Sequence, residues 1–343
     1  MSDPRPGPLR YAHNGAVGIA FEELGGAGGE PLLLVMGLGV SRFWWPPGLI
    51  AELTGQGFHV AAYDQRDAGE STHFPAAGAG SAGPGEHSAS PGASPLTPRP
   101  GTPRGAEHAW PASRRASSRS PITAALRRTS VAYTAEDMTD DAVAVLDALG
   151  WDSAHLFGHS MGGQLAQRTA LRHRQRVRSI TSSASLPSDT GGLAAARYVH
   201  LGLVARMARL RFPEDRDGDI ALGLALARLV ASPGYPFDEA ETRARIERDV
   251  ASGVRDTEAQ SRQVGAKWHG GRLSELRVPA LVLHGERDPL LRPAAARRTA
   301  AAIDGARLVL LPGVGHDLPA AVWPQVAGEV RALADRAAVR TGG

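Results

Sequence analysis

The sequence contains no cysteine, which excludes disulfide bonds, thiol catalysis and cysteine-ligated metal sites. Its 12 histidines are scattered without the short spacing of metal-ligand motifs. No glycine-rich motif for binding a phosphate or a dinucleotide occurs either. The sequence therefore predicts a protein that uses no metal and no cofactor.

Long apolar runs are also missing. No segment approaches the roughly 20 apolar residues of a membrane-spanning helix, and residues 1–10 do not resemble a signal peptide. We therefore expect a cytoplasmic protein with no membrane partner. The formal net charge is only +3, and the five arginines and two glutamates of residues 76–120 account for all of it. The rest of the chain is about neutral, so the charge does not favour a nucleic-acid partner.

Residues 76–120 differ in kind from the rest, because 34 of these 45 positions are Ala, Gly, Pro, Ser or Thr. Such a segment has too little apolar surface to offset the entropy lost on ordering, so we predict a disordered insertion. Contact between its arginines and an anionic partner is an alternative, but an untethered loop is the favoured interpretation.

Outside the insertion, apolar strand-like runs alternate with helix-like segments, which indicates an α/β fold with a mostly parallel central sheet flanked by helices. Strands are expected at 17–22, 32–35, 59–63, 154–157, 177–182, 280–284 and 307–311, and helices at 136–149 and 322–338. Helical patterns alone follow at 193–210, 220–230, 237–251 and 257–268, which predicts a helical cap insertion. The chain is thus expected to divide into core segments 1–75, 121–185 and 278–343, the disordered insertion 76–120 and the helical cap 186–277.

The motif Gly-His-Ser-Met-Gly at residues 158–162 lies between an apolar strand and a segment of good helix formers. Because this chain is rich in Gly and Ser, the five residues alone are weak evidence, and the strand-turn-helix setting carries the prediction. It is typical of a nucleophile elbow, in which the flanking glycines make room for a strained serine. Ser160 is then the candidate nucleophile. The N–H of Met161, at the start of the helix, is a candidate oxyanion donor.

A serine nucleophile needs a base and an acid that orients it. Asp288 and His316 each follow an apolar strand downstream, in the order Ser, Asp, His that hydrolases with this elbow use. A solvated loop position is the ordinary interpretation of either residue alone, but the combination favours a triad of Ser160, Asp288 and His316. Glu286 and Asp317 are weaker candidates for the acid.

The second oxyanion donor is expected in the loop after strand 32–35, where the N–H of Leu38 is the candidate and an ordinary glycine turn is the alternative. Aromatic residues are scarce, at 5% of the chain, so their local clusters are candidates for a pocket wall. Core packing is the alternative for each of these residues. The candidate substrate-binding residues are Phe43, Trp44, His159, Tyr235 and Trp268.

Several segments resemble the α/β-hydrolase superfamily, and within it the branch of aclacinomycin methylesterase and related bacterial hydrolases. They are Tyr-Asp-Gln-Arg-Asp-Ala-Gly-Glu-Ser-Thr at 63–72, Gly-His-Ser-Met-Gly-Gly at 158–163, His-Gly-Glu-Arg-Asp-Pro-Leu at 284–290 and Pro-Gly-Val-Gly-His-Asp-Leu-Pro at 312–319. The superfamily commonly has Gly where this chain has Asp67, a replacement that the methylesterase branch shares. Many members also have His-Gly where this chain has Met36-Gly37.

The resemblance implies the α/β-hydrolase fold. With the candidate triad, it leads us to expect a serine hydrolase that cleaves a carboxylic ester of a small or medium apolar molecule through an acyl-enzyme. The same triad acting on a lactone, an amide or a carbon–carbon bond is an alternative, because one fold serves many reactions. A catalytically weak receptor that binds a ligand under the cap is another.

Overall fold

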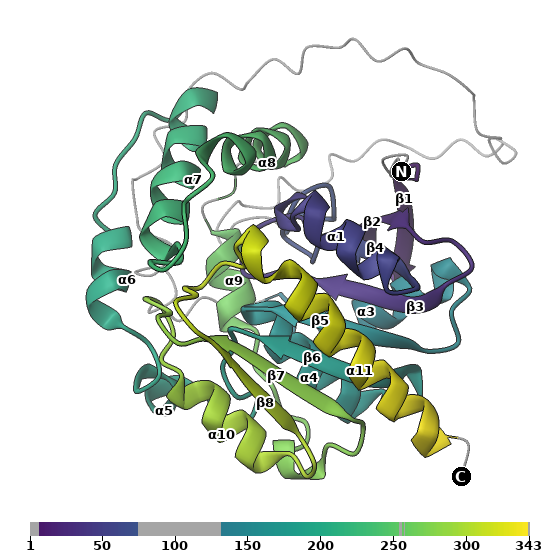
Figure 1. The fold of residues 1–343 in the computed structure, drawn as a ribbon. Coiled ribbons are helices and arrows are strands. Elements are labelled where there is room, and N and C mark those ends of the chain that lie inside the picture. The colour runs from purple at the N-terminus through teal and green to yellow at the C-terminus, as the bar shows by residue number, and fades with distance from the viewer. Residues whose placement is uncertain (1–6, 75–131, 254–255, 257, 342–343) are drawn as a thin grey trace, which may run out of the picture.

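The computed structural model describes residues 7–74, 132–253, 256 and 258–341. The predicted disordered insertion 76–120 lies outside the described residues. Within them, the chain forms an eight-stranded sheet with the strand order β1-β2-β4-β3-β5-β6-β7-β8. From β4 to β8 each neighbouring pair is parallel, and only β2 is antiparallel to its neighbours β1 and β4. The expected mostly parallel sheet is therefore confirmed (Figure 1).

Every strand predicted from the sequence is present, most of them slightly longer. The strands are β1 Arg10–Asn14, β2 Val17–Gly25, β3 Glu30–Val35, β4 Phe58–Tyr63, β5 Ala154–His159, β6 Val177–Ser183, β7 Ala280–Gly285 and β8 Arg307–Leu311. The edge strand β1 was not predicted. Only Ala12 of its five residues is buried, so the segment carries too little apolar signal to stand out.

Helices cover both faces of the sheet. On one face α1 (Pro47–Gly55) and α11 (Trp323–Thr341) pack together, and on the other lie α3 (Ala135–Leu149), α4 (Met161–Arg172) and α10 (Ala294–Ala302). A separate hydrophobic cluster lies on each face. Because strand residues are buried on both faces of the sheet, the sequences of the central strands are continuous apolar runs.

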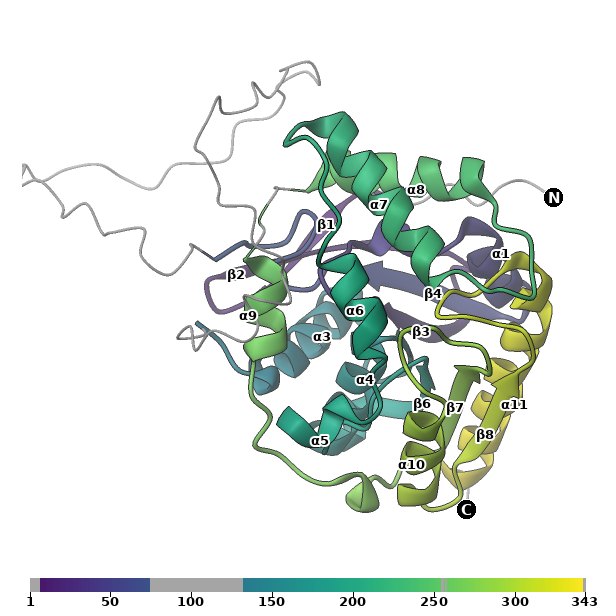
Figure 2. The ribbon, with the colours of Figure 1, turned by 90° about the vertical axis from the view of Figure 1, so that its left-hand side faces the viewer.

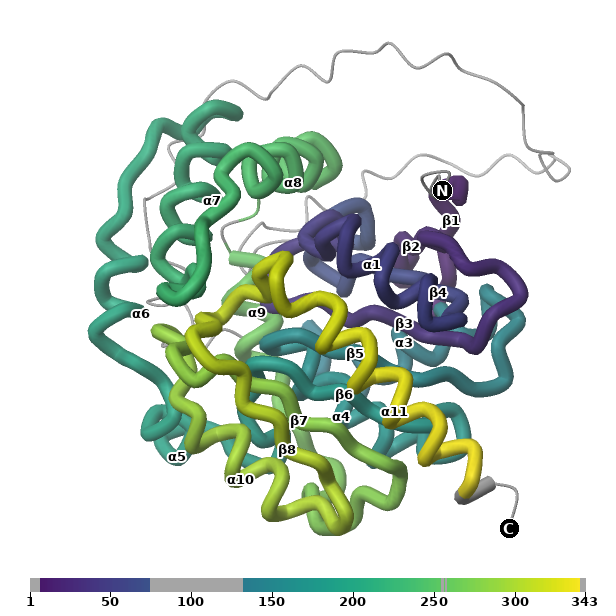
Figure 3. Tube along the Cα trace, in the orientation of Figure 1, coloured from purple at the N-terminus to yellow at the C-terminus, as the bar shows by residue number. Residues whose placement is uncertain are grey.

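The segment between β6 and β7 is helical, as expected for a cap. Its helices are α5 Gly192–Ala196, α6 Leu201–Met207, α7 Arg216–Val230, α8 Glu239–Ser252 and α9 Ala259–Gly265. Figures 2 and 3 show α6, α7 and α8 following one another along one side of the sheet.

The single helix predicted over 193–210 is wrong, because the chain forms two short helices there. Val199 pairs with Leu291 in an antiparallel bridge, and the His200 N–H donates to the Leu290 carbonyl at 2.9 Å. This pairing with the loop after β7 requires extended backbone between α5 and α6, so tertiary contacts override local helical preference. The described part of the chain holds no helix with the length and apolar content needed to cross a membrane.

The close contact between α4 and the loop after β3 predicts a steric effect at Gly162. A Cβ added there would lie 2.0 Å from the Val35 carbonyl oxygen and 2.6 Å from that of Met36. These are backbone atoms, so Gly162→Ala should destabilise the protein by at least about 3 kcal/mol, the upper end of overpacking costs. In α11, by contrast, a Cβ on Gly328 would meet nothing within 4 Å. Gly328→Ala should therefore stabilise by up to about 1 kcal/mol. Urea unfolding of both variants checks the prediction, and equal stabilities would contradict it.

Candidate active site

The turn from β5 into α4 places Ser160 in an unusual backbone conformation, with φ 55° and ψ −123°. A non-glycine residue with positive φ is strained and persists only where its surroundings enforce it. Here the Ser160 N–H donates to the Ser183 carbonyl of β6 at 2.8 Å. The neighbouring glycines are required for space, since a Cβ on Gly158 would lie 2.1 Å from the Gly162 carbonyl oxygen. The local geometry is that of a nucleophile elbow, with Ser160 half-buried at the start of α4.

The loops after β7 and β8 bring an acid and a histidine to this serine. His316 Nε2 lies 3.0 Å from Ser160 Oγ, and His316 Nδ1 lies 2.8 Å from Asp288 Oδ2. An ionised carboxylate only accepts hydrogen bonds, so Nδ1 carries the ring proton and Nε2 is free to accept from the serine hydroxyl. The side chains of Asp288 and His316 are both buried. Of the three residues singled out by their order in the sequence, His316 is thus within hydrogen-bond distance of both Ser160 and Asp288.

The surroundings of Asp288 stabilise its ionised form. Burial opposes the charge, but the attraction of His316, its hydrogen bond and the backbone N–H groups hold the pKa of Asp288 below its usual 3.8. The N–H groups of Leu290 and Leu291 both donate to Oδ1 at 2.8 Å, which leaves Oδ2 for His316. Asp288 therefore has a fixed orientation and a stable negative charge.

The other acidic residues of these loops do not hydrogen-bond the His316 ring. Glu286 is exposed, and Asp317 accepts a hydrogen bond from Ser232 Oγ at 2.5 Å. His284, at the end of β7, donates from Nε2 to the Leu291 carbonyl at 3.0 Å. The geometry favours Asp288 as the partner of His316.

His159, inside the elbow, is the candidate pocket residue that lies against the triad. Its ring centroid is 5.3 Å from that of His316, and its Nδ1 lies 3.2 Å from Ser183 Oγ. Burial, followed by repulsion from His316, lowers the pKa of His159 from 6.5 to about 3. His159 is therefore neutral at pH 7 and adds no charge beside His316.

The loop after β3 lies beside the serine. A Cβ on Gly37 would come within 3.7 Å of Ser160 Oγ, and half-buried Leu38 follows directly. Met161 is the first residue of α4, whose first N–H groups have no partner within the helix. Both backbone positions proposed as oxyanion donors are thus next to Ser160 in sequence or in space.

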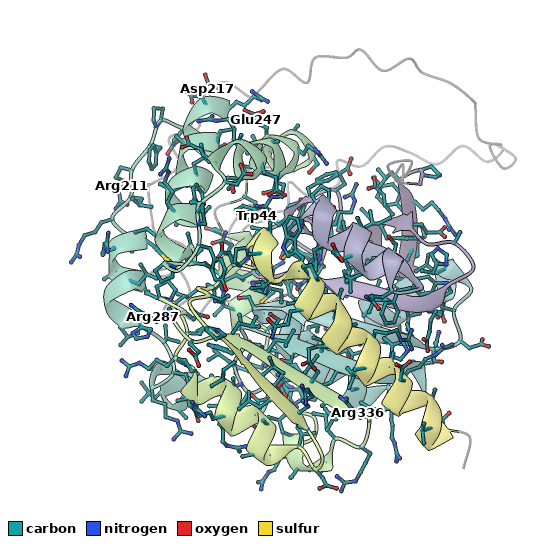
Figure 4. All side chains as sticks on the ribbon, viewed as in Figure 1. Trp44, Arg211, Asp217, Glu247, Arg287 and Arg336 are labelled. Carbon is teal, nitrogen blue, oxygen red and sulfur yellow. The ribbon has the colours of Figure 1, made fainter. Side chains whose placement is uncertain are left out.

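The remaining candidate pocket residues contact other parts of the protein. Trp44, labelled in Figure 4, donates from Nε1 to Asp249 of α8 at 2.9 Å. The Phe43 ring lies against the Arg42 guanidinium, with 4.4 Å to the ring centroid. The Tyr235 hydroxyl donates to the Pro312 carbonyl at 3.2 Å, in the loop that carries His316. In the described part of the chain, no hydrogen bond or ring contact joins these three side chains to the triad.

The structure does not bring Trp268 to the site. Its indole lies under the Arg168 guanidinium of α4, 5.7 Å away, and donates to the Gly271 carbonyl at 3.1 Å. Arg168 is two turns past Ser160, about 12 Å along the helix. Trp268 therefore packs on the outer side of the core, which agrees with the alternative interpretation of core packing.

Asp67 explains why the common glycine of this segment can be replaced. Its φ is 65°, a left-handed conformation that glycine adopts freely. As compensation, the carboxylate accepts from Arg262 at 2.7 and 2.8 Å, from the Tyr133 hydroxyl and from the Phe74 N–H. Asp67, His73 and Asp256 form the one group in the described residues with metal-ligand spacing. Arg262 already pairs with both carboxylates, so the guanidinium supplies the positive charge there.

Several residues that hold the site were missed from the sequence. Gln263 of α9 and Asp249 of α8 bond the loop after β3, and Ser232, just after α7, bonds the loop of His316. Polar residues on cap helices ordinarily face solvent, and nothing in a single sequence distinguishes these three from their exposed neighbours.

Comparison with known proteins agrees with this geometry. A model of the alpha/beta hydrolase fold family matches residues 30–319. The chain therefore belongs to the α/β-hydrolase family, and the expected fold and hydrolase class are confirmed.

The relatives point to the branch expected from the sequence. The chain is 26% identical to rhodomycin D methylesterase DnrP of Streptomyces peucetius, with 94% of this chain and 97% of the relative covered. It is 30% identical to 2-hydroxymuconate semialdehyde hydrolase of Pseudomonas putida, over 57% of this chain and 64% of the relative. Among solved structures, an esterase from Rhodococcus has a TM-score of 0.62 at 18% identity, with 95% of this chain and 98% of that chain covered. That likeness supports the fold alone.

The depressed pKa of His159 predicts a pH dependence of stability. Between pH 6.5 and about 3 the unfolded chain binds a proton at this residue and the folded protein does not. Unfolding is therefore favoured as the pH falls through this window, by up to about 1.4 kcal/mol per pH unit. The free energy of unfolding of His159→Gln should fall less steeply than that of wild type between about pH 6 and pH 4. Urea unfolding at a series of pH values measures both slopes.

His13→Gln, which changes an exposed histidine of β1, is the matched control and should leave the wild-type slope unchanged. Parallel curves for wild type and His159→Gln would contradict the prediction.

Proposed function

We propose that this protein is a serine carboxylic-ester hydrolase that cleaves a small or medium apolar ester through an acyl-enzyme. The observation that carries the proposal is the continuous hydrogen-bond chain from Ser160 through His316 to buried Asp288. It joins a nucleophile, a base with one free ring nitrogen and an ionised acid in the order that acyl transfer requires.

In the acylation step, Ser160 Oγ attacks the ester carbonyl carbon while its proton moves to His316 Nε2. The carbonyl oxygen becomes an oxyanion, which accepts hydrogen bonds from the N–H groups of Leu38 and Met161. The carbon–oxygen bond to the alcohol then breaks, and the leaving oxygen takes the proton from His316. Asp288 stabilises the transient imidazolium throughout.

In the deacylation step, His316 takes a proton from a water molecule as that water attacks the acyl carbon. The second oxyanion is held by the same two N–H groups. When the intermediate collapses, Ser160 Oγ leaves with the proton from His316, which releases the acid and restores the free enzyme. Since no step changes an oxidation state, the chemistry needs no redox group.

The similarity to rhodomycin D methylesterases over nearly the whole chain supports an ester as the substrate class. Action of the same triad on a lactone, an amide or a carbon–carbon bond is the second candidate. It is supported by the partial similarity to 2-hydroxymuconate semialdehyde hydrolase. Product analysis separates the two candidates. An ester yields one acid and one alcohol, whereas a lactone yields a single hydroxy acid, an amide yields an acid and an amine, and cleavage of a carbon–carbon bond releases no alcohol.

Ser160→Ala tests the nucleophile. The wild-type protein should react with a fluorophosphonate probe, which serine attacks at phosphorus with loss of fluoride, and should hydrolyse short-chain p-nitrophenyl esters. Ser160→Ala should retain the thermal melt and lose both activities. Mass spectrometry of the labelled peptide locates the adduct. Ester turnover by Ser160→Ala at the wild-type rate would refute the proposal. An unlabelled wild-type protein that binds esters without turnover would favour the receptor alternative.

Asp288→Asn tests the acid. An amide at this position can donate to Nδ1 and favours the wrong ring tautomer of His316, so kcat should fall by about 10⁴-fold with little change in folding. Glu286→Gln is the matched control, because Glu286 is exposed in the same loop. Steady-state kinetics on the same esters compare the two variants. If Glu286→Gln caused the larger loss, Asp288 would not be the acid.

A further inference from the structure

The loop of residues 36–41, between β3 and the short helix at Arg42–Trp44, is held by two helices of the cap. The Gly39 N–H donates to Gln263 Oε1 of α9 at 2.8 Å. The Ser41 N–H donates to Asp249 Oδ1 of α8 at 2.9 Å. These partners are 224 and 208 residues away in the sequence. The loop that contains Leu38 is therefore fixed by side chains from outside the sheet.

Gln263 connects two core loops through one side-chain amide. It is 3% exposed, and while Oε1 accepts from Gly39, Nε2 donates to the Arg66 carbonyl at 2.7 Å. A backbone N–H can only donate and a carbonyl can only accept, so these partners allow one orientation of the amide. The neighbouring Gln260 leaves no space at Gly39, where an added Cβ would lie 2.2 Å from its Cγ.

Asp249 uses both carboxylate oxygens on the same loop and the helix after it. Oδ1 accepts from the Ser41 N–H, and Oδ2 accepts from Trp44 Nε1 at 2.9 Å. On the other side of Leu38, the Met36 carbonyl accepts from the Gln65 amide. The segment from Gly37 to Val40 therefore lies between anchored residues on both sides.

We propose that Gln263 and Asp249 are positioning residues that orient the Leu38 N–H toward the oxyanion. This inference rests on the proposed function. An oxyanion donor acts only when its N–H lies about 2.7–3.1 Å from the position where the charge develops. The glycines on either side of Leu38 give the backbone wide conformational freedom, so the sequence of the loop does not fix that direction. The cap supplies the missing restraint and thereby contributes to stabilisation of the transition state.

Gln263→Leu tests the proposal, because it removes both hydrogen bonds with little change in volume. We expect kcat to fall by about 10- to 100-fold, the scale of losses from a misplaced catalytic group, with little change in KM. A trifluoromethyl ketone, to which Ser160 adds to form a bound oxyanion, should lose affinity by the same factor as kcat/KM. Loss of a merely structural contact would lower the melting temperature without this parallel loss.

Val264→Ala is the matched control, since Val264 is the next residue of α9 and is 52% exposed. It should retain wild-type kinetics. Asp249→Asn is an independent variant on α8 that removes the acceptor for Trp44. It should reduce kcat by about 3- to 10-fold, less than Gln263→Leu, because one oxygen acceptor remains. A Gln263→Leu variant that folds with wild-type kcat and wild-type ketone affinity would overturn the proposal. If Gln263→Leu fails to fold, Asp249→Asn takes its place: wild-type kcat and wild-type ketone affinity in that variant would overturn the proposal.

Hydrogen exchange separates this inference from the proposed function. In Gln263→Leu the Gly39 amide should exchange at least about tenfold faster than in wild type and Val264→Ala. This readout does not need catalysis. If the wild-type protein hydrolyses no ester but the Gly39 amide still exchanges faster in Gln263→Leu, the proposed ester hydrolase is refuted. The restraint of the loop by Gln263 is then still supported. An active protein with unchanged Gly39 exchange and kinetics in the variant would refute the positioning role alone.

Discussion

The positive φ of Ser160 is the backbone constraint to which the residues around it are fitted. At φ 55° the serine stands clear of β5, but only if its neighbours occupy almost no space. Gly158 and Gly162 meet this requirement, because their Cα atoms lie too close to backbone carbonyls for any side chain. Parallel strands on both sides of β5 then direct the loops that carry Leu38, Asp288 and His316 toward the same edge of the sheet. The strain at one residue is balanced by the packing of the whole central sheet.

The helical segment between β6 and β7 contacts the two loops that carry Leu38 and His316, the proposed oxyanion donor and the proposed base. The His316 N–H donates to the carbonyl of Val230, the last residue of α7, at 2.9 Å. The Gly315 N–H donates to Ser232 Oγ at 2.8 Å. Helices α8 and α9 hold the loop after β3 in the same manner. The helical segment therefore restrains loops of the core by direct hydrogen bonds. A change in how this segment packs would be transmitted through these hydrogen bonds to His316, the proposed base, and to the loop of Leu38, the proposed oxyanion donor.

The sequence was sufficient to predict the fold and the proximity of the three candidate residues, because local pattern and topology agree there. Ser160, Asp288 and His316 each follow a strand with a strong apolar signal, and the carboxyl ends of parallel strands lie at one edge of the sheet. In this sheet the three strands β5, β7 and β8 lie close together, in the order β5-β6-β7-β8. The split between α5 and α6 was missed because Val199 pairs with a residue distant in sequence, and periodicity contains no information on that pairing. The contacts of Gln263 and Asp249 with the loop after β3 were missed for the same reason. A buried polar partner cannot be told from a solvated one until the fold is known.

The distribution of charge explains why the site tolerates two further histidines. Burial lowers the pKa of both His159 and His284, so both remain neutral at pH 7 near His316. Asp288 is held ionised by hydrogen bonds from the backbone and by His316 itself. In the proposed mechanism, a proton that leaves Ser160 therefore has one favourable acceptor, the ring of His316, beside one fixed negative charge. Had either neighbouring histidine been solvated and protonated, its positive charge would oppose the imidazolium that the proposed mechanism forms on His316.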